Sequence, residues 1–283
     1  MSLPVTVVTV AYGSSDVVRK WAHEWSSTGA SCLISDNGNR IPSDISGKVR
    51  VLPFTGNKGF GSGINRAVLE STTPVVLITN PDTRPEHKES LDVLYDHHSR
   101  GSFTGAATVD KAGNKIHSTG IWPSRNWVRS QVFRPAESLW RSDRVDWLQG
   151  SLIMAHRDDF LELEGFSSNY PLYFEDVDIC ARAKKLGFNI NVCPEAGFIH
   201  DEGSGSDRVT ATRLACYHWG MLQFFRDHHP ASVISVRKML IAKCILRLAA
   251  YAVTDREAAR GYYTALRSVY REIAPMLPGN SNG

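Results

Sequence analysis

The first hundred residues alternate short apolar runs, rich in β-branched side chains, with segments of helical periodicity. This alternation predicts βαβ units and a largely parallel sheet. Loops that bind ligands gather at the carboxyl ends of the strands in such a sheet. The expected strands are residues 5–11, 30–35, 49–54 and 74–79, and the expected helices are 16–27, 63–71 and 86–99.

The pattern weakens over residues 101–145, where Trp122, Trp127 and Trp140 are interspersed with arginines. Two interpretations fit: a partly mobile insertion that faces a substrate, or a surface excursion whose aromatic rings pack into the core. Beyond it we expect a strand at 147–155, a helix at 176–186 ended by Gly187, a strand at 188–192, a flexible Gly/Ser loop at 200–206, and helices within 207–226 and 230–275.

Composition restricts the class of protein. The 283 residues carry a formal net charge of only +3, which gives no case for a nucleic-acid partner. The five cysteines are scattered and lack CxxC spacing, so they indicate reduced core thiols and neither a disulfide framework nor a zinc site. No signal-like segment precedes the first strand, and the apolar stretch 239–253 is too short to span a bilayer; we therefore expect a cytoplasmic protein.

Three acids, Glu175, Asp176 and Asp178, directly follow the aromatic residues Tyr173 and Phe174. One interpretation is electrostatic, because acids stabilise a helix N-terminus. The other is catalytic, because partial burial beside aromatic rings would raise a carboxylate pKa toward that of a useful base.

A second acidic turn, Asn80-Pro81-Asp82, ends the apolar run 75–78. A carboxylate there can reach a divalent ion shared with a diphosphate, and oxygen ligands suit Mg²⁺ or Mn²⁺. All three residues are also ordinary turn formers. His200 lies before the Gly/Ser loop, where a neutral imidazole either completes the site that Asp82 begins or is structural.

Two further turns are candidates for nucleotide contacts. The Gly-rich turn 57–63 could place backbone N–H groups near phosphate or ribose, or it is a tight strand-to-helix turn. It matches neither GxGxxG nor GxxxxGK[ST], which disfavours nicotinamide and P-loop chemistry. Asp36 ends the second expected strand, where it either hydrogen-bonds a base or ribose or forms an Asx turn.

Taken in order, these segments resemble family 2 glycosyltransferases with the GT-A fold, in particular the rhamnosyltransferase-like bacterial branch. The resemblance covers about residues 4–205 and is carried by residues 7–12, 36–38, 57–65, 80–83, 147–151 and 165–178. It implies an α/β fold with a mostly parallel central sheet over 1–205, divided into a nucleotide-binding half (1–100) and an acceptor and catalytic half (101–205), and a helical extension at 206–283.

The resemblance also implies an activity: transfer of a sugar, with inversion, from a dTDP- or UDP-linked donor to a polysaccharide or a lipid-linked glycan. It assigns the base to Asp176, with Glu175 as the less favoured choice, and a Mg²⁺ or Mn²⁺ ion to Asp82 and His200. Asn80 replaces the first acid of the family's DXD motif. The nucleotide-sugar positions are Thr9, Ala11, Tyr12, Asp36, Asn57, Gly59, Phe60, Gly61, Asn65, Asn80, Asp82 and Gly150.

Some points stay open at this level. Residues 217–220 replace a polar pair that many members carry, so acceptor binding or leaving-group release differs. A sugar-nucleotide-binding protein without turnover is an alternative, as is a nucleotidyltransferase, although residues 12–15 lack the basic Gly-rich loop of that class. The basic, apolar segment 236–248 predicts peripheral contact with the inner face of a membrane, a helical cap, or a homodimer contact.

Overall fold

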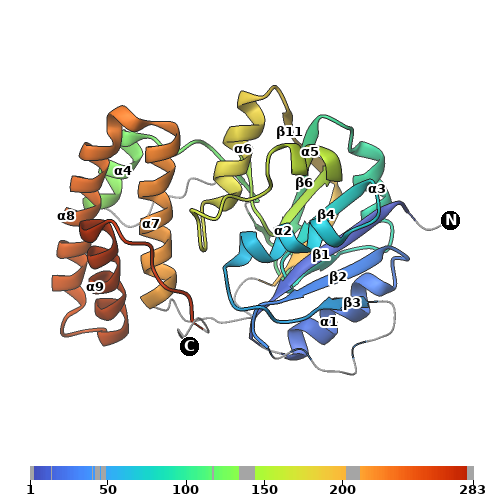
Figure 1. Ribbon diagram of the computed structural model, residues 1–283, viewed down its shortest axis with the longest axis horizontal. Coiled ribbons are helices and arrows are strands. Elements are labelled where there is room, and N and C mark those ends of the chain that lie inside the picture. The colour runs from blue at the N-terminus through green and yellow to red at the C-terminus, as the bar shows by residue number, and fades with distance from the viewer. Residues whose placement is uncertain are drawn as a thin grey trace.

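The computed structural model describes residues 3–13, 15–39, 41, 45, 49–116, 118–133, 144–201 and 211–278. Its centre is a nine-stranded sheet with helices on both faces, and a group of C-terminal helices packs at one end (Figure 1). The expected boundary at 205/206 and most of the Gly/Ser loop lie outside the described residues, as do Arg134, Trp140 and Arg141.

The first half of the chain forms the parallel part of the sheet, as predicted. Its strands run in the spatial order β3-β2-β1-β4 with parallel pairing throughout. The elements of this half are β1 (Val5–Ala11), α1 (Ser15–Ser26), β2 (Ser31–Asp36), β3 (Val49–Leu52), α2 (Phe60–Glu70), β4 (Val75–Thr79), β5 (Thr83–Pro85) and α3 (Ser90–His97).

The second half makes the sheet mixed. β10 pairs antiparallel with both β4 and β6, while β11 is parallel to β6 and antiparallel to β5. Parallel pairing therefore holds throughout the first half and between β6 and β11, and β10 introduces antiparallel pairs at the centre of the sheet. The elements are β6 (Ser102–Val109), β7 (Lys115–Ile116), β8 (Thr119–Gly120), α4 (Arg125–Phe133), β9 (Trp147–Leu148), β10 (Leu152–His156), α5 (Arg157–Glu162), α6 (Glu175–Lys185), β11 (Asn189–His200), α7 (Ala211–His228), the 3-10 turn η1 (Pro230–Ser232), α8 (Val233–Tyr251) and α9 (Arg256–Arg271).

Each face of the sheet has its own core, which explains why the strands are continuous apolar runs. Val8 and Val10 of β1 pack with α2 and α6, whereas Val5 and Val7 pack with α1 and α3. This division follows the two-residue period of a strand. Trp21 is buried on the α1 side and donates its indole N–H to Thr79 Oγ1 at the end of β4.

Three expected elements differ from the structure. The strand expected at 147–155 is interrupted at residues 149–151, which form a turn between β9 and β10. The strand expected at 188–192 continues to His200, past a bulge between Cys193 and Gly197. The helical region 230–275 breaks before Asp255, whose side chain caps α9 by accepting from the N–H groups of Glu257 and Ala258.

Trp122 and Trp127, the described tryptophans of the 101–145 region, pack into the core. Trp122 and Trp127 are partly buried against the main cluster, and the Trp122 ring stacks on Phe224 of α7 at a centroid distance of 6.3 Å. The surface excursion with inserted rings is therefore the interpretation that the described part of this region supports.

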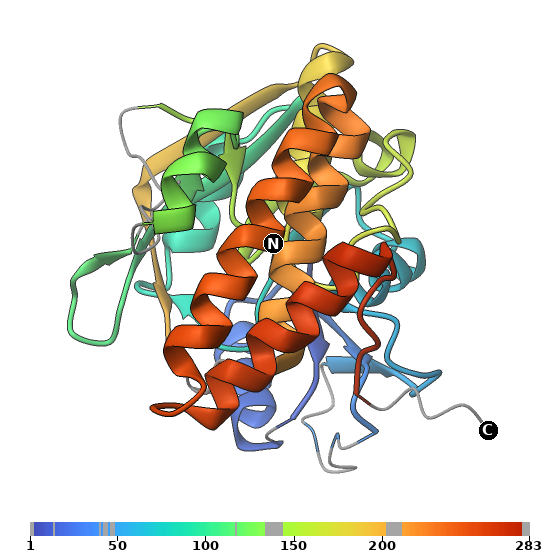
Figure 2. The same cartoon turned by 90° about the vertical axis from the view of Figure 1, so that its left-hand side faces the viewer.

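The C-terminal helices form a layer of their own. α9 packs against both α7 and α8, and α8 also contacts α4 (Figure 2). The buried side of α8 includes Lys243, which is only 7% exposed and forms no ion pair within the described part of the chain. Among the described helices none combines the length and apolar character needed to cross a bilayer.

Burial lowers the pKa of Lys243, so its cationic form destabilises the folded state. We expect Lys243→Met to raise the free energy of unfolding at pH 7 by roughly 1 kcal/mol. A lowered folded-state pKa means that the unfolded chain binds more protons, so the advantage of the variant should shrink as the pH rises toward the unfolded value of 10.5. Thermal and urea unfolding across pH measure this.

The matched control is Lys238→Met on the exposed side of the same helix, which should change stability little. A Lys243→Met protein that is less stable than the wild type at neutral pH would contradict the cost assigned to this buried cation.

Candidate functional site

The acidic helix α6 begins at a strained turn. Tyr173 and Phe174 have φ values of 67° and 71°, in the left-handed region that non-glycine residues rarely adopt. Gly220 of α7 makes this turn possible, because a Cβ there would lie 2.7 Å from the Tyr173 carbonyl oxygen. Strain of this kind is typical of functional sites. The aromatic pair thus fixes how the acids enter the helix.

The three acids of this turn have different environments. Asp176 is partly exposed and accepts hydrogen bonds from the N–H groups of Gly150 at 2.9 Å and Val177 at 2.8 Å. Glu175 is 5% exposed, and its buried Oε2 has no hydrogen-bond partner among the described residues. Asp178 is buried and bonds Arg182 and His228, each at 2.8 Å. Asp178 is therefore a structural acid, whereas Glu175 and Asp176 have no such charged partner among the described residues, and of these two only Asp176 is partly exposed.

Burial raises the pKa of Glu175 well above its usual range, and the neighbouring carboxylate of Asp176 adds to that rise. The pKa of Asp176 is also raised by burial, although the N–H groups of Gly150 and Val177 oppose the rise by stabilising the anion. Raised carboxylate pKa values are a property of general bases. Asp176 combines this property with exposure and a fixed orientation.

A second polar group forms where β4, β5 and β11 meet. His200 pairs with Thr83 across β5 and β11, which places its Nε2 3.2 Å from Asp82 Oδ1. The same nitrogen lies 3.4 Å from Asn80 Nδ2. The structure therefore brings together the two expected metal ligands and the amide that replaces the first acid of the motif.

These side chains fit a divalent cation. Two ligands of one octahedral Mg²⁺ lie about 3 Å apart, close to the distance between Asp82 Oδ1 and His200 Nε2. His200 Nε2 faces an acceptor and an amide donor at once, so either protonation state of that nitrogen leaves one neighbour poorly matched. A carboxylate with an imidazole suits Mn²⁺ as well as Mg²⁺.

The two groups are joined through one turn. The Asn80 N–H donates to Ser151 O, and the adjacent Gly150 N–H donates to Asp176. Residues 149–151 therefore separate the expected metal ligands from the expected base at one edge of the sheet.

The Gly-rich turn 57–63 packs closely against the segment before α6. A Cβ on Gly59 would lie 2.1 Å from Pro171 O, and one on Gly61 would lie 2.8 Å from Phe166 Cβ. Phe60 approaches Gly150 closely: a Cβ added to Gly150 would lie 3.3 Å from the Phe60 ring. These glycines allow the turn to approach the acidic segment closely.

Several expected nucleotide-sugar positions have structural contacts of their own. Thr9 is fully buried, and its hydroxyl donates to Thr79 O. Asn65 binds both the N–H and the C=O of Phe166. Asp36 Oδ1 accepts from the N–H groups of Gly38 and Asn39, as expected for an Asx turn. Ala11 is buried, whereas Tyr12 is half exposed and open to a ligand.

Asn57 connects the donor-side turn to the C-terminal segment. Its Oδ1 accepts from the Gly59 N–H at 3.2 Å, and its Nδ2 donates to Pro278 O at 2.9 Å. Residues on this segment were not expected near the site, because nothing in their sequence marks them.

The sequence also gave no signal for Asp201, which follows His200. Its buried carboxylate lies 2.7 Å from Arg84, 3.4 Å from Lys111 and 3.6 Å from Lys20. The Asp201 N–H donates to Asp82 O, which fixes the turn 80–82 to the end of β11. A pocket of about 200 Å³ opens beside these residues, between α1 and the turn that carries Asp82.

No family model matches the chain. It is 27% identical to an N-acetylglucosaminyl-diphospho-decaprenol L-rhamnosyltransferase of Mycobacterium tuberculosis, over 70% of this chain and 75% of that protein. It is also 27% identical to the rhamnosyltransferase WbbL of Escherichia coli K12, over 50% and 60% of the two chains. These relatives confirm the resemblance to rhamnosyltransferase-like glycosyltransferases.

The fold is similar to that of a solved mannosyltransferase of Pyrobaculum calidifontis in complex with GDP-Man and Mn²⁺. The TM-score is 0.54 at 13% identity, and the match covers 95% of this chain and 85% of that one. A mycobacterial protein of known structure matches with a TM-score of 0.50 at 14% identity, over 78% and 74% of the two chains. The expected glycosyltransferase-like α/β fold is thereby confirmed.

The different environments of the acids on α6 predict different effects on stability. Asp178→Asn removes the buried negative charge and one of the two acceptor oxygens that bind Arg182 and His228, so it should lower the free energy of unfolding by about 3 kcal/mol. Asp176→Asn keeps an acceptor for a backbone N–H and removes a charge that burial disfavours, so it should cost less than about 1 kcal/mol. Urea unfolding at pH 7 compares the two. Equal losses would contradict the assignment of Asp178 alone as the structural acid.

Proposed function

We propose that this protein is an inverting glycosyltransferase that moves a sugar from a nucleotide-diphosphate donor to a glycan acceptor on a lipid diphosphate in cell-envelope synthesis. The observation that carries the proposal is the arrangement at one sheet edge. Asp82 and His200 lie on one side of the turn 149–151, and Asp176 lies on the other side, bonded to Gly150. Inversion requires such a separation between leaving group and base.

Asp176 is the general base of this proposal. The N–H groups of Gly150 and Val177 orient its carboxylate. Its raised pKa makes it a stronger base toward the hydroxyl proton of the glycan acceptor. Glu175 is buried behind it and is poorly placed to meet a substrate. The charge of Asp176 also raises the pKa of Glu175, so we assign Glu175 a supporting role beside the base.

Asp82 and His200 hold the divalent ion, with Asn80 beside them. When bound, Mg²⁺ or Mn²⁺ neutralises charge on the departing diphosphate. Asp201 keeps this turn in place through its N–H bond to Asp82 O, while Arg84 and two lysines add positive charge nearby. The exposed ring of Tyr12 and the free side of the Asp36 carboxylate are the positions that we assign to the nucleoside.

The relatives support the acceptor class. The Mycobacterium tuberculosis relative is, by its name, a rhamnosyltransferase that acts on N-acetylglucosaminyl-diphospho-decaprenol. We propose the same acceptor class for this chain, and a dTDP- or UDP-linked donor, with rhamnose as the first sugar to test.

Two variants test the assignment of roles. Asp176→Asn should reduce kcat by about 10²–10⁴-fold while leaving metal-dependent donor binding intact, because the base acts only in the chemical step. Asp82→Ala should remove the stabilisation that Mn²⁺ adds with the donor diphosphate. Product formation and thermal shifts with uridine and thymidine diphosphate sugars measure the two effects.

Asp158→Asn is the control, since that acid is exposed and lies away from the site. Unchanged turnover in both Asp176→Asn and Asp82→Ala would refute the proposed mechanism. Donor binding by the wild type without transfer to any acceptor would instead favour a sugar-nucleotide-binding protein.

We also propose that α8 contacts an anionic membrane that holds the acceptor. One side of this helix exposes Ile234, Ile245 and Leu246, and Val253 follows its end. Residues 233–271 carry eight Lys and Arg against two acids, whereas the whole chain is only +3. Apolar side chains among cations fit the interface of a membrane with anionic lipids. The opposite side of α8 packs against α4 and α9. The proposal therefore combines the expected membrane contact with the expected helical cap.

Vesicle co-sedimentation tests this contact. The protein should bind phosphatidylglycerol vesicles more tightly than phosphatidylcholine vesicles, and salt should weaken the binding. Replacing Ile245 and Leu246 together by Ser should weaken binding by roughly tenfold or more. Leu69→Ser, which alters an exposed leucine on α2, is the control. Concentration-dependent dimers that the double variant abolishes, without vesicle binding, would assign the surface to a second copy instead.

A further inference from the structure

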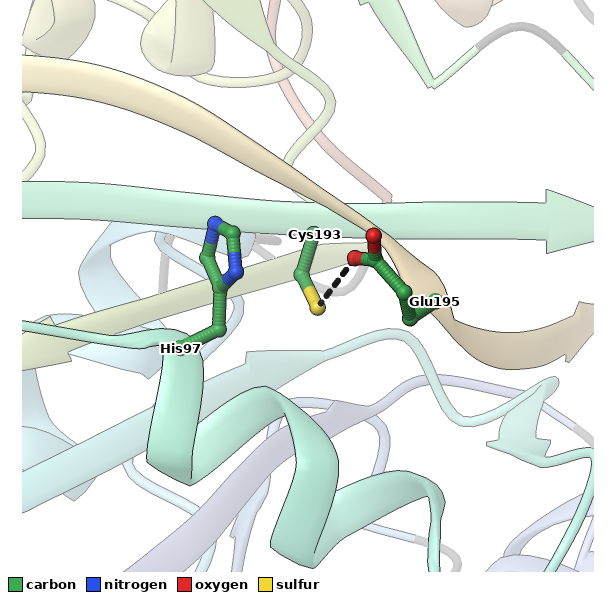
Figure 3. Close-up of side chains that lie close together, drawn as sticks. All are labelled: His97, Cys193 and Glu195. Atoms are coloured by element: carbon green, nitrogen blue, oxygen red, sulfur yellow. Dashed lines mark hydrogen bonds between the residues drawn. The ribbon is translucent and has the colours of Figure 1, made fainter.

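A second group of metal-binding side chains lies away from the site described above. His97 ends α3, and Cys193 and Glu195 lie on β11, against which α3 packs (Figure 3). Their ligand atoms all lie within 4.8 Å of one another. Cys193 and His200 are seven positions apart on β11, on the order of 20 Å along a strand. The group is therefore distinct from the ligands of the donor-side ion.

The geometry matches one edge of a tetrahedral site. Cys193 Sγ lies 3.6 Å from Glu195 Oε2. In a tetrahedral zinc site with ordinary Zn–S and Zn–O lengths, these two ligand atoms are about 3.6 Å apart. The imidazole of His97 is exposed, so rotation of its side chain can complete the third position without a backbone shift.

The backbone supports the arrangement through an irregularity of the sheet. The register between β6 and β11 shifts between Cys193 and Gly197, so Glu195 lies within a bulge. Bulges re-orient side chains and are enriched near functional sites. Here the bulge leaves Glu195 exposed beside the fully buried thiol of Cys193.

The chemistry of the three side chains selects the ion. A thiolate with an imidazole favours Zn²⁺ over Mg²⁺ or Ca²⁺, which prefer oxygen ligands throughout. A divalent ion between the sulfur and the carboxylate oxygen would replace the proton that the Cys193 thiol donates to Glu195.

We propose that His97, Cys193 and Glu195 form a zinc-class metal site that connects α3 to β11, with its fourth position open to solvent. Two of its ligands are exposed and one forms the buried floor, which gives the ion an entry path. The site rests on observations independent of the proposed transferase function.

Cobalt(II) titration of the full-length, metal-free protein tests the site, because a cobalt–thiolate bond gives a charge-transfer absorption that other ligands lack. The wild type should show this absorption, saturating at about one equivalent of Co²⁺. Zinc should remove it, and Cys193→Ser should abolish it. His97→Ala and Glu195→Gln should each weaken Co²⁺ binding by roughly tenfold or more, since even the partners of metal ligands contribute that much.

Two control variants separate this site from the rest of the protein. Asp82→Ala should keep the thiolate absorption, because the donor-side ligands include no sulfur. Cys32→Ser, at a buried thiol on β2, which four strands separate from β11, should keep it as well. Absence of the absorption in the wild type, or its persistence in Cys193→Ser, would overturn the proposal. If Cys193→Ser does not fold, unchanged Co²⁺ affinity in His97→Ala, an exposed position, would overturn it equally.

Discussion

The antiparallel pairing of β10 with β4 is the constraint on which the candidate site depends. It opposes Leu152 to Thr79, so the turn 149–151 must lie beside the residues that follow β4. Gly150 then donates its N–H to Asp176, and this positions the proposed base relative to the proposed metal ligands. A parallel crossover at this place would have sent residues 149–151 to the opposite edge of the sheet. The departure from an all-parallel sheet is therefore what assembles the site.

Electrostatics divides the acidic residues by function. Asp178 and Asp201 are buried with cationic partners, so they stabilise the turns that carry other groups. Glu175 and Asp176 are held without such partners, and burial raises the pKa of both. The left-handed conformations of Tyr173 and Phe174 add a conformational cost at the same place. Asp178 and Asp201 thus stabilise the fold, whereas Glu175 and Asp176 lower its stability when they are ionised.

Much of this fold could be predicted from periodicity. The first four expected strands and the helix at Glu175–Lys185 are present, because buried parallel strands and an amphipathic helix leave strong local patterns. Ordered motifs also singled out Asp82 and His200, which the structure brings within 3.2 Å of each other, and Asp176, whose role stays a prediction. The turn inside the expected strand 147–155 was missed, since Gly150 and Ser151 are compatible with an extended run until the partner strand is known. Asp201, Gly220 and Pro278 were missed because their roles depend on contacts with distant segments.

The hydrogen bond between Asn57 and Pro278 joins residues 221 positions apart. During synthesis the parallel half of the sheet emerges first, yet its donor-side turn lacks this contact until almost the whole chain described here has been made. The sequence separation of this contact is very large, and closing so long a loop is slow compared with forming the local βα units. The donor-side turn should therefore mature late in folding, after the sheet that supports it, and a nascent chain would hold a formed scaffold with an incomplete binding loop.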